Sequence, residues 1–391
     1  MNLDKSTVIG IAGAGTMGAG IAQVAATFGH SVFLYDTSTE QLDRAKESLN
    51  KILNRLVEKK WITQDEMNAT LGNITFTDQI SNFKDCGLVI EAIFENLAVK
   101  KELMSNIEGL TNGDTILASN TSSLSIASIS SALKTPEKFL GIHFFNPAPL
   151  MKLVEIVPSI STDDEVAASV KKFIDGWGKV TVMAKDTPGF IVNRVARPFY
   201  SEAIRMYEEG IADVATIDWV MKEMGGFKMG PFELMDLIGH DVNFEVTSTV
   251  FKEFFYDPRF KPSFTQKRLV EAGRLGRKSG RGFYDYRDGA KNPEPDTDKE
   301  KGQKILNRIL AMLINEACDA VFMNVATAED VDLAMTNGVN YPKGLLAWGD
   351  EVGLDQVLDW MSTLQVEYRE DRYRPNPLLK KMVREKRTFF S

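Results

Sequence analysis

The chain has 391 residues, which is too many for one ordinary hydrophobic core, so two or three domains are expected. Its net charge of −8 argues against a nucleic-acid-binding protein, which would need a basic face. The two cysteines, Cys86 and Cys318, provide neither a disulfide framework nor the spacing of a metal site. No signal-peptide pattern and no bilayer-spanning apolar run is visible, so we expect a soluble, cytoplasmic protein without a membrane partner.

A dinucleotide-binding turn is predicted near the N-terminus. Residues 8–12 are typical of a buried strand, Gly13, Gly15 and Gly18 follow as G-x-G-x-x-G, and residues 21–28 are typical of a helix. Gly13 allows a tight turn, Gly15 lets the backbone approach a pyrophosphate, and Gly18 lets the helix pack closely on the strand. The helix N-terminus would then direct its free N–H groups and its dipole at the phosphates.

Asp36 indicates which dinucleotide binds. It ends the second predicted strand, formed within residues 30–35, and lies eighteen residues after Gly18. A carboxylate at this point accepts hydrogen bonds from the adenine ribose and repels a 2′-phosphate, so NAD is predicted rather than NADP. The alternative, an ordinary turn aspartate, is weaker because the glycine pattern stands between a strand and a helix.

Further short apolar segments alternate with helical stretches and predict a doubly wound, Rossmann-type α/β domain over residues 1–185. The predicted strands are 86–93, 115–120, 139–145, 153–158 and 179–184. Ligands of such sheets bind at the carboxyl ends of the strands. Polar residues at or just beyond predicted strand ends are Glu91, Asn120, Ser122, His143 and Asn146.

Two of these apolar segments each contain one titratable residue, His143 in the first and Glu155 in the second. An ionisable group inside an apolar strand is costly unless it is paired or hydrogen-bonded. Taken alone, His143 would be interpreted as a structural core histidine and Glu155 as a solvent-facing residue. The position of His143 near a strand end favours a functional role instead.

Residues 40–63 are predicted to form a long amphipathic helix. Its apolar stripe is Leu42, Ala45, Leu49, Ile52, Leu53 and Leu56. The basic residues on or near its polar side are Lys51, Arg55, Lys59 and Lys60. Such a face is usually only solvated, but beside a cofactor cleft it could hold a phosphate-bearing substrate.

The second half of the chain is helical in pattern and repeats itself. Residues recur with an offset of 114, as when Asn193 and Arg194 return as Asn307 and Arg308. A polar, proline-bearing linker separates the copies. The second copy is predicted to lack the "DTPGF" lead and the "GRKSGRGFYDY" tail of the first. The predicted segments are a helical domain over 186–286, a linker over 287–302 and a degenerate second copy over 303–391.

Several motifs together resemble one family, the short-chain L-3-hydroxyacyl-CoA dehydrogenases. They are "GAGTMGAGIAQ", "EAIFENLAVK", "SNTSSLSI", "HFFNPAPLMKLVEIV", "DTPGFIVNR", "MGPFELMDLIG" and "GRKSGRGFYDY", in family order from residue 8 to 286. Residues 303–391 resemble the second C-terminal domain of longer members. The resemblance implies all-α C-terminal domains like that of 6-phosphogluconate dehydrogenase, NAD as cofactor, and an acyl-CoA thioester as substrate. The implied reaction is the reversible oxidation of (S)-3-hydroxyacyl-CoA, foremost 3-hydroxybutyryl-CoA, to 3-oxoacyl-CoA.

The resemblance also implies roles for single residues. His143 is the general acid/base, Glu155 orients it, and Ser122 and Asn193 hydrogen-bond the reacting group and substrate. Implied NAD contacts are Gly13, Gly15, Thr16, Met17, Gly18, Asp36, Glu95, Lys100, Asn120 and Lys278. Implied CoA-substrate contacts are Ser48, Lys51, Arg55, Ser122 and Asn146. No metal is implied.

The chemistry of these residues agrees with the implied roles. Hydride loss from a C3 carbinol needs the hydroxyl proton removed, and histidine titrates near neutral pH. Glu155 would fix the tautomer of His143 and stabilise its imidazolium, so the two apolar segments are expected to be adjacent strands. Ser122 and Asn193 are neutral donors suited to a carbonyl oxygen. Outside the motifs, each would be interpreted as a helix cap or a helix-face residue.

Other functions stay open at this point. A dicarboxylyl thioester such as 3-hydroxyadipyl-CoA is one, because tandem-domain members are frequent there, but no residue for its terminal carboxylate is identified. A crystallin-like NAD(H)-binding protein or an NADH-sensing repressor is another. The retained site residues, the acidic balance and the lack of a helix-turn-helix argue against it. A lysine acid/base, as in 6-phosphogluconate and 3-hydroxyisobutyrate dehydrogenases, is disfavoured by the histidine motif.

The second helical copy lacks a nucleotide domain of its own and is predicted to be non-catalytic. In two-domain relatives the C-terminal domains form a dimer. We therefore expect either a homodimer or a monomer in which the tandem copy occupies the partner surface within one chain.

Overall fold

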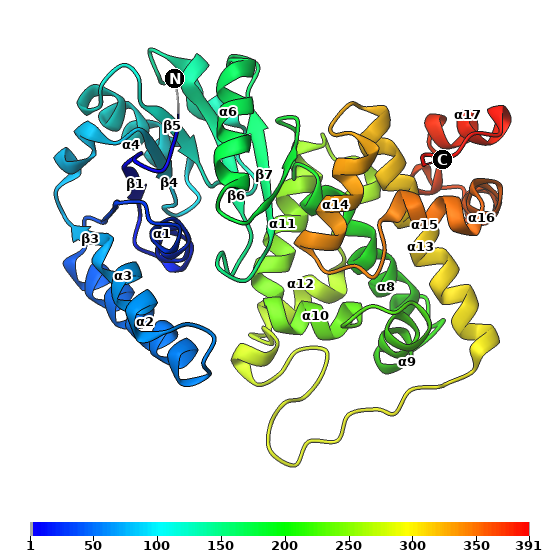
Figure 1. The fold of residues 1–391 in the computed structure, drawn as a ribbon. Coiled ribbons are helices and arrows are strands. Elements are labelled where there is room, and N and C mark those ends of the chain that lie inside the picture. The colour runs from blue at the N-terminus through cyan, green and yellow to red at the C-terminus, as the bar shows by residue number, and fades with distance from the viewer. Residues whose placement is uncertain (1–2, 391) are drawn as a thin grey trace. The chain divides into compact units, whose positions relative to one another are not determined.

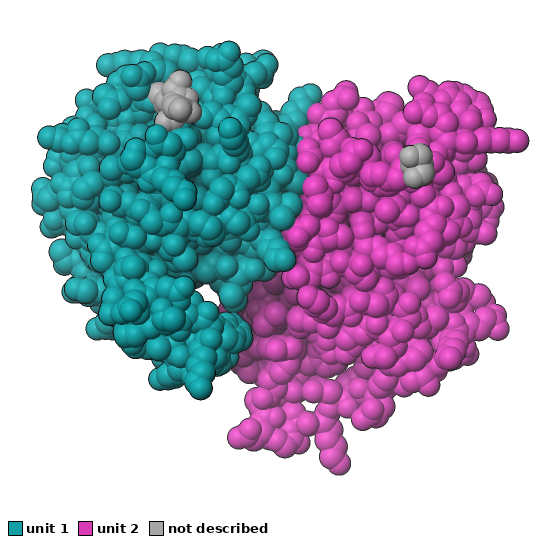
Figure 2. Space-filling view, viewed as in Figure 1, with its two compact units in different colours: residues 1–190 teal, residues 191–391 magenta. Residues whose placement is uncertain are grey.

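The computed structural model describes residues 3–390. The chain divides into two compact units, Met1–Phe190 and Ile191–Ser391, which Figure 2 colours separately. Each unit has a hydrophobic interior of its own. Within the described residues, no helix combines the length and the apolar character needed to cross a bilayer.

The first unit is built on one eight-stranded sheet (Figure 1). Its strands are β1 (Ile9–Ala12), β2 (Val32–Tyr35), β3 (Ile74–Thr77), β4 (Leu88–Glu91), β5 (Ile116–Ser119), β6 (Phe139–Phe144), β7 (Leu153–Pro158) and β8 (Val180–Met183). The strand order is β3-β2-β1-β4-β5-β6-β7-β8, and only β6 and β7 pair in an antiparallel manner. The order reverses between β1 and β4, as in doubly wound sheets, which confirms the predicted Rossmann-type fold.

Helices connect the strands of the first unit. They are α1 (Thr16–Thr27), α2 (Thr39–Glu58), α3 (Gln64–Gly72), α4 (Leu97–Leu110), α5 (Ile126–Ser130) and α6 (Asp164–Asp175), with the 3₁₀ turns η1 (Ile80–Asp85) and η2 (Pro136–Lys138). Compared with the predicted span of 40–63, α2 begins one residue earlier, where Ser38 caps it, and ends five residues earlier, after Glu58. Ile52, assigned to the apolar stripe, is instead 45% exposed. The edge strand β3 was not predicted.

The two faces of the sheet carry different side chains, apolar on one face and partly polar on the other. On one face, alternate strand residues such as Ile11, Ile90 and Ile142 join a large apolar cluster with residues of α1, α2 and α6. Successive side chains of a strand point to opposite faces. Glu91, Ser119, His143 and Glu155 therefore lie on the other face. Glu91 is opposite Ser119 and His143 is opposite Glu155, while Ser119 pairs with Gly141, two residues before His143.

The second unit is all-α and contains the same helical pattern twice. The first copy has α7 (Val192–Val195), α8 (Arg197–Glu208), α9 (Val214–Trp219), α10 (Pro231–Ile238), α11 (His240–Glu253) and α12 (Phe264–Glu271), with the π-helical η3 (Val220–Met224) and the 3₁₀ turns η4 (Pro258–Phe260) and η5 (Arg277–Ser279). The second has α13 (Lys299–Phe322), α14 (Ala328–Gly338), α15 (Leu345–Val352), α16 (Leu354–Tyr368), η6 (Asp371–Tyr373) and α17 (Pro377–Glu385). The tandem all-α arrangement agrees with the predicted fold class.

The two copies pack through α8 and α13, which lie side by side (Figure 1). Arg194 Nε donates to Glu316 Oε1 at 2.9 Å, and Arg308 Nε donates to Glu202 Oε2 at 3.0 Å. Each arginine and each glutamate is the repeat of the other, 114 residues apart. The contact is therefore reciprocal, as in an isologous dimer interface.

The prediction that the second copy has lost its tail needs correction. In the first copy, Asp236 accepts backbone N–H groups from Phe283 and Tyr284. In the second copy its equivalent, Asp350, accepts the same bonds from Phe389 and Phe390 at 3.0 and 2.8 Å. The tail of the second copy is thus shortened, and the aspartate that anchors it keeps the same function.

The two thiols give a prediction about reactivity. Cys86 and Cys318 are fully buried, and burial raises the pKa of Cys86 to about 12 and that of Cys318 well above its usual range. Because the thiolate is the reactive form, neither thiol should react with 5,5′-dithiobis(2-nitrobenzoate) at pH 8 in the folded chain. Both should react once guanidinium chloride unfolds it. A stoichiometric reaction before unfolding would contradict this burial.

Candidate active site

The glycine-rich turn between β1 and α1 has the geometry predicted for it. Gly13 adopts φ +108°, a conformation that favours glycine, and its N–H donates to the carbonyl of Tyr35 at 2.7 Å. A Cβ on Gly18 would lie 1.8 Å from the carbonyl oxygen of Gly13, whereas a Cβ on Gly15 would have no atom within 4 Å. Gly18 is needed for packing, and Gly15 leaves open space at the start of α1.

This contrast makes a matched pair of variants informative. Gly18→Ala should destabilise the first unit by about 1–3 kcal/mol or more, because the new methyl overlaps backbone. Gly15→Ala should fold normally, since its φ of −67° suits alanine, but should lose NADH binding because the methyl fills the space for the pyrophosphate. Urea denaturation and NADH fluorescence titration measure the two effects. Normal NADH affinity in Gly15→Ala would contradict the assignment.

Asp36 lies directly after β2, beside the glycine turn. Its Oδ2 accepts the N–H of Ala14 at 2.9 Å and its Oδ1 accepts the N–H of Ser38 at 3.0 Å. The carboxylate is therefore held in one orientation by backbone donors. Asp36 remains partly exposed, so it can still accept hydroxyl donors from a ribose.

His143 and Glu155 form a buried pair. They lie opposite each other in the antiparallel register of β6 and β7, and His143 Nδ1 is 2.6 Å from Glu155 Oε2. The histidine is 5% exposed and the glutamate 0%. With Nδ1–H donating to the carboxylate, the proton-accepting lone pair is on Nε2. This is the adjacent-strand arrangement expected from the sequence.

The other two histidines have structural surroundings. His30 Nδ1 lies 3.1 Å from the carbonyl of Thr7, and its ring packs against Phe173. His240 Nε2 lies 2.7 Å from Asp236 within the helical unit, and it is fully buried. Only His143 combines a carboxylate partner with a place on the polar face of the sheet.

A second group of charges supports the loop after β5. Lys100 is buried, and its Nζ lies 2.6 Å from Glu91 Oε1 and 3.1 Å from Glu95 Oε2. Glu95 accepts hydrogen bonds from Thr121, from the N–H of Ser122 at 3.2 Å and from Ser123. Burial acts to raise the pKa of Glu95, but Lys100 and these donors lower it below its usual range. The network fixes the backbone of Ser122.

Glu91 was noted in the sequence only as a residue at a strand end. In the structure its carboxylate is fully buried and also accepts from Ser119 at 2.6 Å. The sequence could have predicted this pairing, because a charged residue at the end of the apolar strand "LVIE" needs a partner. Lys100, expected to contact NAD, has its ammonium in the interior with Glu91 and Glu95.

The remaining predicted residues of the first unit lie at different places. Asn120 Oδ1 accepts the N–H of Phe144 at 2.8 Å, which ties the end of β5 to β6, and Asn146 is exposed just after β6. Ser48, Lys51 and Arg55 are exposed on α2. Their spacing of three and four residues places them on one face of that helix.

Two predicted residues belong to the helical unit. Asn193 is partly exposed in α7. Lys278 is in η5, and its Nζ lies 2.6 Å from Asp241 Oδ1.

The fold and the site together define a class of protein, the dehydrogenases that bind NAD on a Rossmann-type sheet. Comparison with protein families is more specific. Residues 8–187 match the NAD-binding domain of 3-hydroxyacyl-CoA dehydrogenase, and residues 189–286 and 305–388 each match its C-terminal domain. The chain belongs to the 3-hydroxyacyl-CoA dehydrogenase family and is an NAD-dependent dehydrogenase.

Individual relatives agree with this assignment. A 3-hydroxyadipyl-CoA dehydrogenase of Escherichia coli K12 is 39% identical, over 95% of this chain and 96% of that protein. A mitochondrial hydroxyacyl-coenzyme A dehydrogenase of Homo sapiens is 42% identical, over 71% of this chain and 90% of that protein. A crystal structure of a 3-hydroxybutyryl-CoA dehydrogenase from Escherichia coli K12 substr. MG1655 superposes with a TM-score of 0.92 and 37% identity, and covers 98% of this chain and 99% of that one.

Proposed function

We propose that the chain oxidises short (S)-3-hydroxyacyl-CoA thioesters, such as 3-hydroxybutyryl-CoA, to 3-oxoacyl-CoA with NAD, and that His143 is the general acid/base. The observation that supports the proposal most strongly is the buried pair of His143 and Glu155. In the oxidation, His143 Nε2 takes the proton of the C3 hydroxyl. Glu155 holds the ring by Nδ1 and stabilises the imidazolium that forms.

Neutral hydrogen-bond donors are proposed to orient the substrate. We assign the hydroxyl of Ser122 to an oxygen of the substrate, since Glu95 fixes the backbone of that residue by accepting its N–H. We assign the same task to the Asn193 amide and place Asn146 along the substrate. A neutral donor stabilises charge that develops on oxygen without itself exchanging a proton.

The cofactor is proposed to bind across the glycine-rich turn. The open space at Gly15 and the unshared N–H groups of Thr16 and Met17 at the start of α1 suit a pyrophosphate. NAD supplies a nicotinamide that accepts the hydride from C3. We assign the adenine ribose to Asp36, further NAD contacts to Glu95, Asn120 and Lys278, and to Lys100 the support of Glu95.

The exposed face of α2 is proposed to bind the CoA moiety. Ser48, Lys51 and Arg55 are all exposed there, and CoA carries several phosphate charges. A cation on a flexible stem binds such phosphates with little geometric demand.

The experiment that tests this function measures NAD reduction at 340 nm with (S)- and (R)-3-hydroxybutyryl-CoA, each with NAD and with NADP. Turnover is expected with the (S) substrate and NAD. NADP should be used poorly, because Asp36 repels its 2′-phosphate. Equal use of NADP, or turnover of the (R) substrate alone, would overturn the proposal.

A second candidate substrate class is a thioester whose acyl chain ends in a carboxylate, such as 3-hydroxyadipyl-CoA. It is favoured by a pocket in the helical unit that contains a buried arginine. We also propose that the chain divides into four segments, at residues 1–185, 186–286, 287–302 and 303–391. The last of these, the second helical copy, is proposed to replace a dimer partner.

A further inference from the structure

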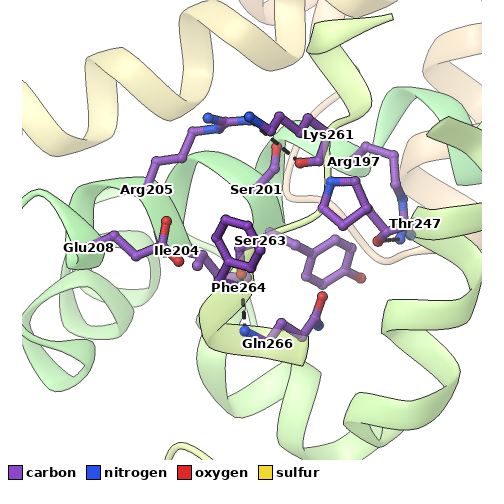
Figure 3. A pocket seen from close by; sticks show the side chains of 12 residues that line it. Arg197, Ser201, Ile204, Arg205, Glu208, Thr247, Lys261, Ser263, Phe264 and Gln266 are labelled. Carbon is purple, nitrogen blue, oxygen red and sulfur yellow. Dashed lines mark hydrogen bonds between the residues drawn. The ribbon is translucent and has the colours of Figure 1, made fainter. Parts of the chain in front are cut away.

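The first helical copy contains a pocket with a volume of about 120 Å³ (Figure 3). Arg197, Tyr200 and Ser201 of α8, Thr247 of α11 and Gln266 of α12 contribute to its lining. A water molecule occupies about 30 Å³ in the liquid. The pocket therefore has room for a carboxylate with attached methylene groups.

Arg197 has unusual surroundings for a buried charge. Arg197 is 5% exposed. One Nη donates to Thr247 Oγ1 at 3.2 Å, and the guanidinium lies 4.9 Å from the ring of Tyr200. Among the described residues, its Nε has no hydrogen-bond acceptor and no carboxylate forms an ion pair with it. Burial lowers the pKa of the guanidinium, opposed only by the hydroxyls of Tyr200 and Tyr341. Burying an unpaired charge is costly, so an anionic partner is expected.

The repeat provides an internal comparison. The two copies are offset by 114 residues up to η4 and η6, and by 113 residues after these turns. With these offsets, the second-copy equivalents of Arg197, Tyr200, Thr247 and Gln266 are Ala311, Ile314, Met361 and Leu379. Those four residues of the second copy are all fully buried and apolar. The fold thus accepts an ordinary apolar core at this place, and the polar lining of the first copy is not required by packing.

The second copy nevertheless contributes to the cluster around Arg197. Tyr341 is buried, its ring lies 5.7 Å from that of Phe199, and its hydroxyl has no partner among the described residues. Tyr341 is not among the residues that line the pocket, so the donor that the pocket offers to a carboxylate is the guanidinium of Arg197.

The position of Arg197 in the sequence connects the pocket to the substrate. It follows Asn193 by four residues, across α7 and the start of α8, where Ala196 keeps a helical conformation. Four residues of helix advance about 6 Å along one face. In an adipyl group the terminal carboxylate carbon is three carbon–carbon bonds beyond C3. If Asn193 holds the substrate at C3, this chain end is in reach of Arg197.

We propose that Arg197 binds the terminal carboxylate of a dicarboxylyl-CoA substrate and so determines the acyl specificity of this enzyme. This inference rests on the proposed function, because it assumes that Asn193 contacts the substrate. Thr247 and Tyr200, which also line the pocket, hold the guanidinium.

The test compares two thioesters of equal chain length, 3-oxoadipyl-CoA and 3-oxohexanoyl-CoA, which differ in a terminal carboxylate or methyl. NADH oxidation at 340 nm gives kcat/KM for each. The parent should prefer 3-oxoadipyl-CoA by about 30-fold or more, since losing one partner of a buried charged pair costs about 2 kcal/mol or more. In Arg197→Met this preference should fall to about one, and Arg197→Lys should restore part of it.

Two controls keep the result interpretable. Arg268→Met removes an exposed arginine that pairs with Glu271 outside the pocket, and it should keep the parental preference. Thermal unfolding shows whether Arg197→Met is folded. If it is not, Thr247→Val, which removes the hydroxyl that accepts from Arg197, should lower the preference several-fold.

The outcomes separate the two proposals. If the parent reduces acetoacetyl-CoA and 3-oxohexanoyl-CoA as well as 3-oxoadipyl-CoA, the proposed function stands and the role of Arg197 is overturned. A preference that survives in folded Arg197→Met overturns it as well. If the parent turns over no 3-oxoacyl-CoA while it binds NADH, the proposed function itself fails, and the inference with it.

Discussion

His143→Gln should lower kcat for acetoacetyl-CoA reduction by about 10²–10⁴-fold, the range that a positioned general acid/base contributes. Glutamine can fill the space and hydrogen-bond Glu155, but it cannot exchange a proton near neutral pH. Since the chemical step is affected and not cofactor binding, the dissociation constant of NADH should stay within a few-fold of the parental value. Steady-state kinetics and fluorescence titration measure the two quantities.

Glu155→Gln provides the companion experiment. The amide keeps the shape of the carboxylate, which lies 2.6 Å from Nδ1 of His143. It can, however, present its NH₂ to Nδ1, and this disfavours the reactive tautomer, in which Nδ1 carries the proton. We expect a smaller loss than in His143→Gln, and a double variant no worse than His143→Gln alone, because the residues act as a unit. His30→Gln is the control for loss of a structural histidine. A His143→Gln variant with parental kcat would show that another group is the base.

Arg308→Met should destabilise the helical unit by about 3–5 kcal/mol, the usual cost of removing one partner from a buried ion pair. Arg308 donates to Glu202 at 3.0 Å, to Glu209 at 2.7 Å and to the hydroxyl of Tyr373 at 2.6 Å. Glu202 is fully buried, and its remaining cation is Arg205 at 3.5 Å. The change therefore removes the nearer cation of a buried carboxylate and leaves it with Arg205 and the hydroxyl of Tyr373, which donates at 2.9 Å. Urea denaturation followed by circular dichroism gives the free energy of unfolding.

The repeat provides a second variant with a different expected size. Arg194→Met removes the reciprocal contact to Glu316, but Arg259 also pairs with Glu316 at 3.1 Å. Its cost should therefore be smaller than that of Arg308→Met. Arg44→Met, which removes an exposed pair with Glu40, should cost no more than about 1 kcal/mol. Equal stability of Arg308→Met and Arg44→Met would contradict the buried interface.

The same interface bears on assembly. Glu202 and Arg308 meet within one chain as two subunits would meet in a dimer. Deleting residues 290–391 should expose α8 and produce a chain that dimerises or aggregates, measured by light scattering. A truncated chain that stays a well-folded monomer would count against the replacement of a partner by the second copy.

Much of the first unit could be predicted from the sequence, because its constraints are local. The spacing of Gly13, Gly15 and Gly18 has few solutions in three dimensions, and the short turn after β6 returns the chain beside itself. That return brings Glu155 opposite His143. The edge strand β3 was missed because it has four residues, so its alternation of Ile74 and Phe76 with two threonines is too short to stand out.

Other features could not be predicted because they depend on distant segments. Lys100 appears in the sequence as an ordinary helix residue, and only the fold shows its ammonium between Glu91 and Glu95. Arg197 likewise stands in a helical segment with no nearby acid in the sequence. In the fold, too, no acid pairs with Arg197. This becomes visible only when α8, α11 and α12 are assembled around the pocket.

The most direct test of the account is the initial rate of NADH oxidation at 340 nm with acetoacetyl-CoA, measured for the parent chain and His143→Gln side by side. The parent is expected to turn over at roughly 1–10³ s⁻¹, as most enzymes do, and the variant to lose nearly all of that rate. A parent that binds NADH but reduces neither acetoacetyl-CoA, 3-oxohexanoyl-CoA nor 3-oxoadipyl-CoA would contradict the account.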